Sequence, residues 1–80
     1  MSIKKIIFSR HSKRRMKLYG ISEADVKIVL KNGKKELIEN RSIFTLKIRK
    51  FKFPLKVVAE REENNIYIIT AYPLKRGLEK

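Results

Sequence analysis

The single histidine of the chain, His11, stands four residues before Arg15 in a segment that is predicted to be helical. Residues spaced i and i+4 are neighbours on one side of a helix, so the imidazole and the guanidinium are expected to lie together. Histidine exchanges a proton near neutral pH and can serve as an acid or a base. A guanidinium can donate two parallel hydrogen bonds to a phosphate. The pair is therefore a candidate site for chemistry on a phosphate-containing ligand.

Both residues also have structural roles that the sequence leaves open. His11 stands at the start of the predicted helix, where its ring could bond a backbone group or pack against a sheet. Arg15 could orient the same helix through an ion pair with an acid such as Glu23 or Glu60. Met16 is expected in the core, because a flexible thioether fills gaps between other apolar side chains.

The charge of the chain indicates a polyanionic partner. Its 80 residues include 21 Lys+Arg and 8 Asp+Glu, which gives a net charge of +13. Like charges at this density repel one another, and a nucleic acid, an anionic membrane or an acidic protein would relieve that repulsion. Apolar runs such as 6–8 and 66–69 are too short to cross a bilayer, and no signal-peptide core follows the N-terminal lysines. We expect a nucleic acid as the partner, no membrane, and a cytoplasmic location.

Few residues are available to hold a metal or a cofactor. The chain has no cysteine and one histidine, and its acids are not clustered as ligands. No glycine-rich phosphate loop is present. Neither a metal site nor a cofactor is expected, and the absence of cysteine agrees with a reducing compartment.

The elements that must position these residues follow from the spacing of apolar side chains. Ser9 and Ser22 are predicted helix N-caps, and Gly20 and Asn32–Gly33 are predicted helix ends. From residue 35 the apolar spacing changes from helical to alternating. The predicted elements are a strand over 4–8, two helices over 10–19 and 23–31, and strands over 36–39, 44–49, 55–60 and 66–72.

This order, β-α-α-β-β-β-β, predicts one α+β domain over residues 1–80, with 74–80 as a basic C-terminal tail. A helical hairpin is expected to pack on one face of a twisted, mainly antiparallel sheet of four or five strands. In the segment 44–49, Lys47 and Arg49 alternate with apolar residues. The other face of the sheet is therefore expected to be an open, shallow, basic surface.

Two stretches resemble the domain-of-unknown-function 4258 family. The first is FSRHSKRRMKLYGISEADVKIVL, which resembles the opening of that family: a histidine, three residues, Arg-Met, a short gap and Gly-Ile-Ser. Those positions are His11, Arg15, Met16 and 20–22. The ending PLKVVAEREENNIYIITAYP resembles the family's hydrophobic strand, polar turn and final strand. The family is in turn similar to the RelE/ParE and BrnT-like toxins, which implies a RelE-like domain and a toxin paired with an acidic antitoxin.

RelE-like ribonucleases cleave RNA without a metal, through attack by the RNA's own 2′-hydroxyl group. The resemblance therefore makes His11 and Arg15 catalytic candidates. Such toxins often place a catalytic aromatic residue or arginine on the last hairpin, where Arg61 and Tyr72 stand. Tyr72 occupies the position of an arginine in BrnT-like chains. It could be an acid, a platform on which a base stacks, or a core residue, and we favour stacking or core over acid chemistry.

The remaining basic residues are candidates for contact with RNA phosphates. They are Arg14, Lys47, Arg49, Lys56, Arg61, Lys75 and Arg76. The resemblance, together with the basic charge, thus implies a metal-independent endoribonuclease that acts on RNA, with ribosome-bound mRNA as one candidate substrate, and is held inactive by an antitoxin. A non-enzymatic nucleic-acid-binding module and a docking protein for an acidic partner stay open as alternatives, as does the oligomeric state.

Overall fold

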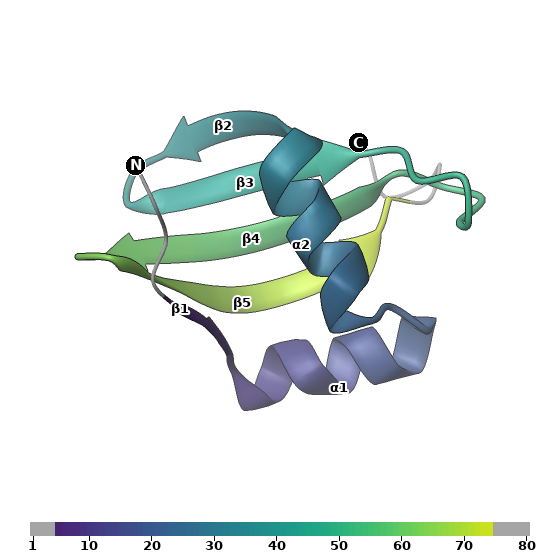
Figure 1. The fold of residues 1–80 in the computed structure, drawn as a ribbon, viewed down its shortest axis with the longest axis horizontal. Helices are drawn as coiled ribbons and strands as arrows, with labels where there is room; N and C mark the ends of the chain where they lie inside the picture. Colours follow the sequence, from purple (N-terminus) through teal and green to yellow (C-terminus); the bar gives the residue numbers. More distant parts are fainter. Residues whose placement is uncertain (1–4, 75–80) are drawn as a thin grey trace.

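A computed structural model describes residues 5–74 as a five-stranded mixed sheet with two helices (Figure 1). The elements are β1 (Lys5–Phe8), α1 (Arg10–Tyr19), α2 (Glu23–Asn32), β2 (Lys34–Ile38), β3 (Arg41–Leu46), β4 (Leu55–Glu62) and β5 (Asn65–Pro73). The strand order is β1-β5-β4-β3-β2, in which β1 runs parallel to β5 and the other neighbours are antiparallel. The predicted α+β class and order of elements are confirmed.

The helix α1 begins and ends where its capping residues predict. The Ser9 hydroxyl accepts a hydrogen bond from the Ser12 backbone N–H at 3.0 Å. Gly20 has φ 71°, the left-handed conformation that glycine adopts without a steric cost. Ser12 and Met16 are buried, and Tyr19 packs partly against the core. The predicted core position of Met16 is therefore confirmed.

The helix α2 crosses the sheet in front of β3 and β4, whereas α1 lies along β5 (Figure 1). Ser22 and Asp25 form a reciprocal capping box at its start. Val26 and Val29 are completely buried and pack with sheet residues such as Phe44 and Val57. The two helices are joined by a short link. They pack on different strands, α1 on β5 and α2 on β3 and β4.

The register of the strands divides the sheet into a helix-covered face and an open face. Buried residues such as Phe44 and Val57 pair across strands on the covered face. On the open face, the residues that pair across β2, β3, β4 and β5 form three rows. These rows are Lys34–Thr45–Lys56–Tyr72, Glu36–Ile43–Val58–Thr70 and Ile38–Arg41–Glu60–Tyr67.

Several boundaries differ from the prediction, and the end of β3 moves candidate residues. β2 begins at Lys34 rather than 36, because Lys34 pairs with Thr45 of β3. β3 ends at Leu46 rather than 49. Ile48 instead packs against the core and its carbonyl accepts a hydrogen bond from the N–H of Phe51, which turns the chain. Residues 47–54 therefore form a loop, which we call the β3–β4 loop.

Candidate functional site

The position of α1 depends on the shortness of β1. β1 pairs only with the first part of β5, from Asn65 to Ile68. Beyond Phe8 the chain enters α1, and the Ser9 N–H donates to the Ile68 carbonyl at 3.1 Å. The Ser9 hydroxyl donates to the Ile69 carbonyl at 3.2 Å. These bonds attach the start of α1 to β5, so that the helix continues along the part of β5 that β1 leaves unpaired.

An irregularity in β5 turns two of its side chains toward the open face. Val58 pairs with Thr70 and Ala59 pairs with Ile68, so Ile69 is an extra residue in the ladder. In a regular strand, positions 68, 70 and 72 would share a face. Because of the bulge, Ile68 is buried on the covered face, while Thr70 and Tyr72 belong to the open face.

His11, Arg15 and Tyr72, the three predicted catalytic candidates, line one hollow. Its volume is about 280 Å³, and Tyr19 and Thr70 complete the lining. We call it the α1–β5 hollow. His11 and Arg15 are exposed, and the Arg15 Nη1 donates a long hydrogen bond of 3.4 Å to the Tyr19 hydroxyl. The structure thus brings together residues that are about sixty positions apart in the sequence.

Tyr19 and Thr70 were not predicted as part of the site. Tyr19 follows Arg15 by four residues, as Arg15 follows His11, so the helical spacing could have indicated it. Thr70 could not have been placed in this way, because its direction depends on the bulge at Ile69.

Lys56 extends the site across the open face. It pairs with Tyr72, and its Nζ atom lies 5.9 Å from the centre of the Tyr72 ring. The same row continues through Thr45 to Lys34 on β2, which was not predicted as a site residue. The row beside the α1–β5 hollow therefore carries two lysines and no acid.

The opposite end of the open face is electrically balanced. There, the Arg41 Nε lies 3.5 Å from the Glu60 carboxylate in an exposed ion pair. Arg61 lies further along β4, beside Glu62. It is five residues from Lys56, or about 16 Å along a strand. Arg61 is therefore not part of the site at Tyr72.

Among residues 5–74, His11 and Arg15 make none of the backbone bonds or ion pairs that a purely structural role could use. Arg15 forms no ion pair with Glu23 or Glu60, because Glu60 pairs with Arg41 instead. The His11 ring makes no hydrogen bond within the same residues and is not buried. Both side chains are exposed and line the α1–β5 hollow.

The other predicted RNA-binding residues occupy three places. Arg14 is exposed on α1, three residues after His11. Lys47 and Arg49 were expected on the sheet, but this was wrong: both belong to the β3–β4 loop, since β3 ends at Leu46. Lys75 and Arg76 lie outside the described residues.

The β3–β4 loop is attached to α2 through a buried carboxylate. Asp25 is 6% exposed, and its Oδ2 accepts hydrogen bonds from the Ser22 N–H at 3.0 Å and from the Lys50 Nζ at 3.2 Å. Burial is the largest influence on its pKa and raises it. The hydrogen bonds from Ser22 and Lys50, with the charge of Lys50, outweigh burial and hold the pKa of Asp25 below its ordinary value of 3.8.

A larger hollow, of about 620 Å³, lies between β1, α1 and α2. It is lined by Lys5, Lys13, Lys27, Glu23 and the apolar run 6–8. Within residues 5–74, its lining includes no imidazole, no guanidinium and none of the predicted site residues. Its size alone does not make it the better candidate, because His11, the one histidine of the chain, lines the α1–β5 hollow instead.

The family model described as "Domain of unknown function (DUF4258)" matches residues 8–73. The chain belongs to this family. The match covers α1 and β5, and therefore every residue that lines the α1–β5 hollow of this DUF4258 chain. No curated protein and no solved structure matches the chain.

Two kinds of feature are missing from residues 5–74. No helix of this DUF4258 chain in that range has the length and apolar character needed to cross a membrane. In the same range, no three His, Asp or Glu side chains are grouped so that they could hold a metal ion.

Proposed function

We propose that this chain is a metal-independent endoribonuclease of the RelE/BrnT-like toxin type, held inactive by an acidic antitoxin. One observation carries the proposal: His11, Arg15 and Tyr72 line the same exposed hollow, beside Lys56. These side chains supply an imidazole that can exchange a proton, a guanidinium that can bind a phosphate, an aromatic ring and a further cation. The net charge of +13 supports an anionic substrate.

In the proposed reaction, the 2′-hydroxyl oxygen of RNA attacks the adjacent phosphorus, and the bond from phosphorus to the 5′-oxygen of the next nucleotide breaks. His11 accepts the proton of the 2′-hydroxyl group. The leaving 5′-oxygen takes a proton from a water molecule in the exposed hollow, and the hydroxide ion that remains takes the proton from His11, which restores the neutral imidazole. The products are a 2′,3′-cyclic phosphate and a 5′-hydroxyl end.

Arg15 and Lys56 would act on the charge of the reacting phosphate. Negative charge increases on the phosphate oxygens as the phosphorus becomes five-coordinate, and fixed cations at that point stabilise the transition state. Arg15 can bind two of these oxygens, whereas Lys56 acts as a point charge beside Tyr72. The Tyr72 ring would hold a base next to the phosphate by stacking.

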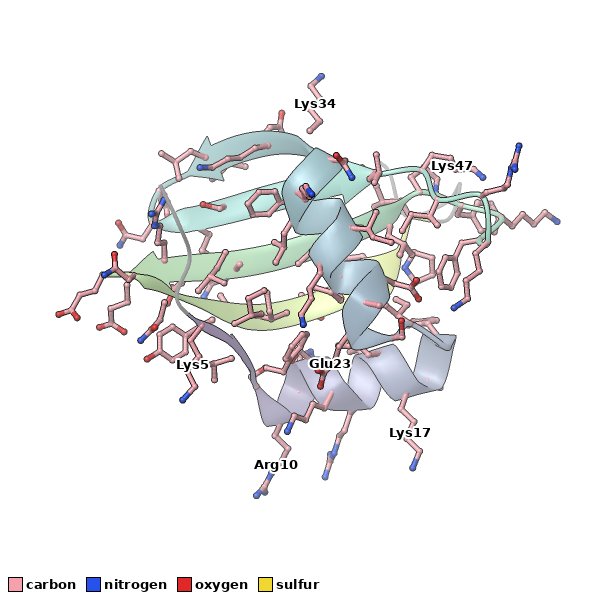
Figure 2. The ribbon with its side chains drawn as sticks, in the orientation of Figure 1. Lys5, Arg10, Lys17, Glu23, Lys34 and Lys47 are labelled. Carbon is pink, nitrogen blue, oxygen red and sulfur yellow. The ribbon has the colours of Figure 1, made fainter. Side chains whose placement is uncertain are left out.

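The proposal is tested with purified protein and a single-stranded RNA in the presence of a metal chelator. We expect cleavage with 2′,3′-cyclic phosphate ends, reduced about 10²–10⁴-fold by His11→Ala and about 10²–10³-fold by Arg15→Ala. Arg10→Ala is the matched control, because Arg10 lies on the same helix and points away from the sheet (Figure 2). Intact RNA with folded wild-type protein would refute the proposal.

The same variants test the biological role. Induction of the wild-type chain in a bacterium that lacks an antitoxin should arrest growth and deplete mRNA, and His11→Ala or Arg15→Ala should relieve the arrest. Harmless expression with unchanged mRNA would contradict the toxin assignment. Co-purification with a small acidic protein encoded next to this chain would support an antitoxin partner.

One observation favours a non-enzymatic nucleic-acid-binding module as a second candidate. A catalytic base is commonly held in place by a third group, and within residues 5–74 no carboxylate lines the α1–β5 hollow. This candidate predicts RNA binding that weakens steeply with salt, no cleavage, and no change of affinity in His11→Ala.

A further inference from the structure

The β3–β4 loop carries four cations and two phenylalanines within eight residues. It projects beyond the ends of β3 and β4, and Lys47 marks its start in Figure 2. We propose that this loop binds single-stranded RNA, so that nucleotides next to the α1–β5 hollow continue across Lys56 onto the loop. The inference rests on the proposed function in one respect, namely that RNA is the ligand.

Half of the loop side chains hold the loop in shape. Ile48 and Phe51 pack against the core. The Lys47 Nζ donates to the Phe51 carbonyl at 2.8 Å, which closes the loop on itself. The Lys50 Nζ reaches the buried Asp25 carboxylate at 3.2 Å. These contacts give the loop a defined conformation before any ligand binds, which lowers the entropy cost of binding.

Three other side chains of the loop are left available to a ligand. Arg49 and Lys52 are exposed, and neither makes an ion pair or a side-chain hydrogen bond within residues 5–74. Phe53 is partly buried but is not among the rings packed against the core. The Lys52 Nζ lies 5.8 Å from the centre of that ring. A ring flanked by cations is the combination that binds one base and its neighbouring phosphates.

The position of the loop connects it to the proposed reaction site. The Leu74 N–H donates to the Pro54 carbonyl at 2.7 Å, so the end of the loop lies against the end of β5. Phe53 precedes Lys56 by three residues, or about 10 Å of extended chain. Lys56 pairs with Tyr72 in the α1–β5 hollow. Cations and rings thus continue from the hollow to the loop.

The chemistry of these residues favours a single strand over a duplex. In an RNA duplex the bases are stacked and paired, so a side-chain ring has no free base face to contact. A duplex would use Arg49 and Lys52 but leave Phe53 without a role. Within residues 5–74, the other end of the open face has the Arg41 guanidinium paired with Glu60, which leaves less positive charge available there.

Binding is measured apart from cleavage with a fluorescent RNA of about 12 nucleotides, a length within the range of compact single-strand binders. All its riboses carry 2′-O-methyl groups, which remove the attacking hydroxyl. Affinity is measured between about 50 and 200 mM salt. Arg49→Ala/Lys52→Ala should lower the slope of log affinity against log salt by about 1.4, because each phosphate that the protein no longer neutralises accounts for about 0.7.

Phe53→Ala should weaken binding about tenfold, within the range for removal of one stacked base, and leave the salt slope unchanged. Phe53→Leu keeps apolar bulk without an aromatic face, so it separates stacking from an effect on folding, and it should weaken binding to a similar extent. The matched charge control is Arg10→Ala/Lys17→Ala, because both side chains point away from the sheet on α1 (Figure 2). It should change affinity less than threefold.

Three results would overturn the inference: an equal decrease of slope in the control pair, wild-type affinity in both Phe53 variants, or equal affinity for a duplex of the same length. Failure of the proposed function is recognised separately. If unmodified RNA is left intact but the loop variants bind the 2′-O-methyl RNA more weakly than wild type, the loop binds RNA and the chain is not a ribonuclease. If RNA is cleaved and the loop variants bind normally, only the loop inference fails.

Discussion

Replacing Asp25 with alanine should loosen two parts of the molecule at once. One carboxylate oxygen of Asp25 accepts two hydrogen bonds, one from the Ser22 N–H at the start of α2 and one from Lys50 in the β3–β4 loop. The substitution removes half of the capping box and releases the loop from the helix. Asp25 is nearly buried, so water only partly replaces these bonds.

The expected loss of stability can be estimated from the two interactions. Removal of a helix-capping interaction costs about 1 kcal/mol. The Lys50 ion pair contributes about 0.5–1 kcal/mol, at the upper part of the range for exposed pairs, because the lysine is 58% exposed but the acid is not. Together the free energy of unfolding should fall by about 1.5–2 kcal/mol, which lowers the midpoint temperature by roughly 6–16 °C in a domain of this size.

The pH dependence has a defined sign. The pKa of Asp25 is lower in the folded chain than its ordinary value of 3.8, because its hydrogen bonds and Lys50 outweigh burial. A lowered pKa means that the carboxylate stabilises the fold fully above its unfolded-state pKa and loses this effect as the pH falls through the folded-state pKa. The stability difference between wild type and Asp25→Asn should therefore be largest at neutral pH and shrink below about pH 4.

The assay is chemical unfolding followed by circular dichroism at several pH values, with Lys50→Ala as the partner variant. Lys50→Ala should cost only the ion-pair part, about 0.5–1 kcal/mol, and should have little further effect in an Asp25→Ala background. A decrease below about 0.5 kcal/mol in Asp25→Ala, or strictly additive effects in the double variant, would show that the carboxylate does not connect α2 to the loop.

Three further substitutions test the framework and the site. Gly33→Ala should lower the free energy of unfolding by about 2 kcal/mol in a denaturant titration, because a Cβ atom there would lie 2.5 Å from the Val29 carbonyl oxygen and 2.9 Å from that of Thr45. Ser9→Ala should cost about 1–2 kcal/mol in the same titration, since it removes both the α1 cap and the bond to the Ile69 carbonyl. Tyr72→Phe should keep RNA cleavage within about threefold of wild type, and Tyr72→Ala should lower it about tenfold, because stacking needs the ring but not the hydroxyl. A large decrease of cleavage in Tyr72→Phe would instead assign acid chemistry to the hydroxyl.

Local signals in the sequence predicted the elements well. The caps Ser9 and Ser22 act on the backbone within three residues, so their effect can be read without the tertiary structure. Gly20 ends α1 for an equally local reason. The i, i+4 spacing of His11 and Arg15 likewise placed both side chains on one side of α1, where the α1–β5 hollow lies.

Alternation of residues was a less reliable guide to the sheet. Ile48 and Phe51 are apolar because they attach the β3–β4 loop to the core, not because β3 continues through them. The same alternation that suggested a strand therefore misplaced Lys47 and Arg49. Strand pairing is non-local, and only the register with β4 shows that β3 ends at Leu46.

The direction of Tyr72 was not predictable from periodicity, and it decides whether the site exists. The run from Ile66 to Tyr72 is apolar at successive positions, which is typical of a central strand. β5 is indeed flanked by β1 and β4, but its buried residues are spaced two and then three apart, because Ile69 is extra. Without that residue in the register, Tyr72 would share the buried face of Ile68.

The bulge and α1 are held by the same side chain, which explains how the two halves of the site stay aligned. The Ser9 hydroxyl donates a hydrogen bond to the carbonyl of the bulge residue Ile69. It accepts another from the Ser12 N–H in the first turn of α1. The helix that carries His11 is thereby attached to the point of β5 that turns Tyr72 outward. The Ser9 N–H also donates a hydrogen bond to the Ile68 carbonyl, so two bonds from one residue fix the start of α1 relative to the bulge.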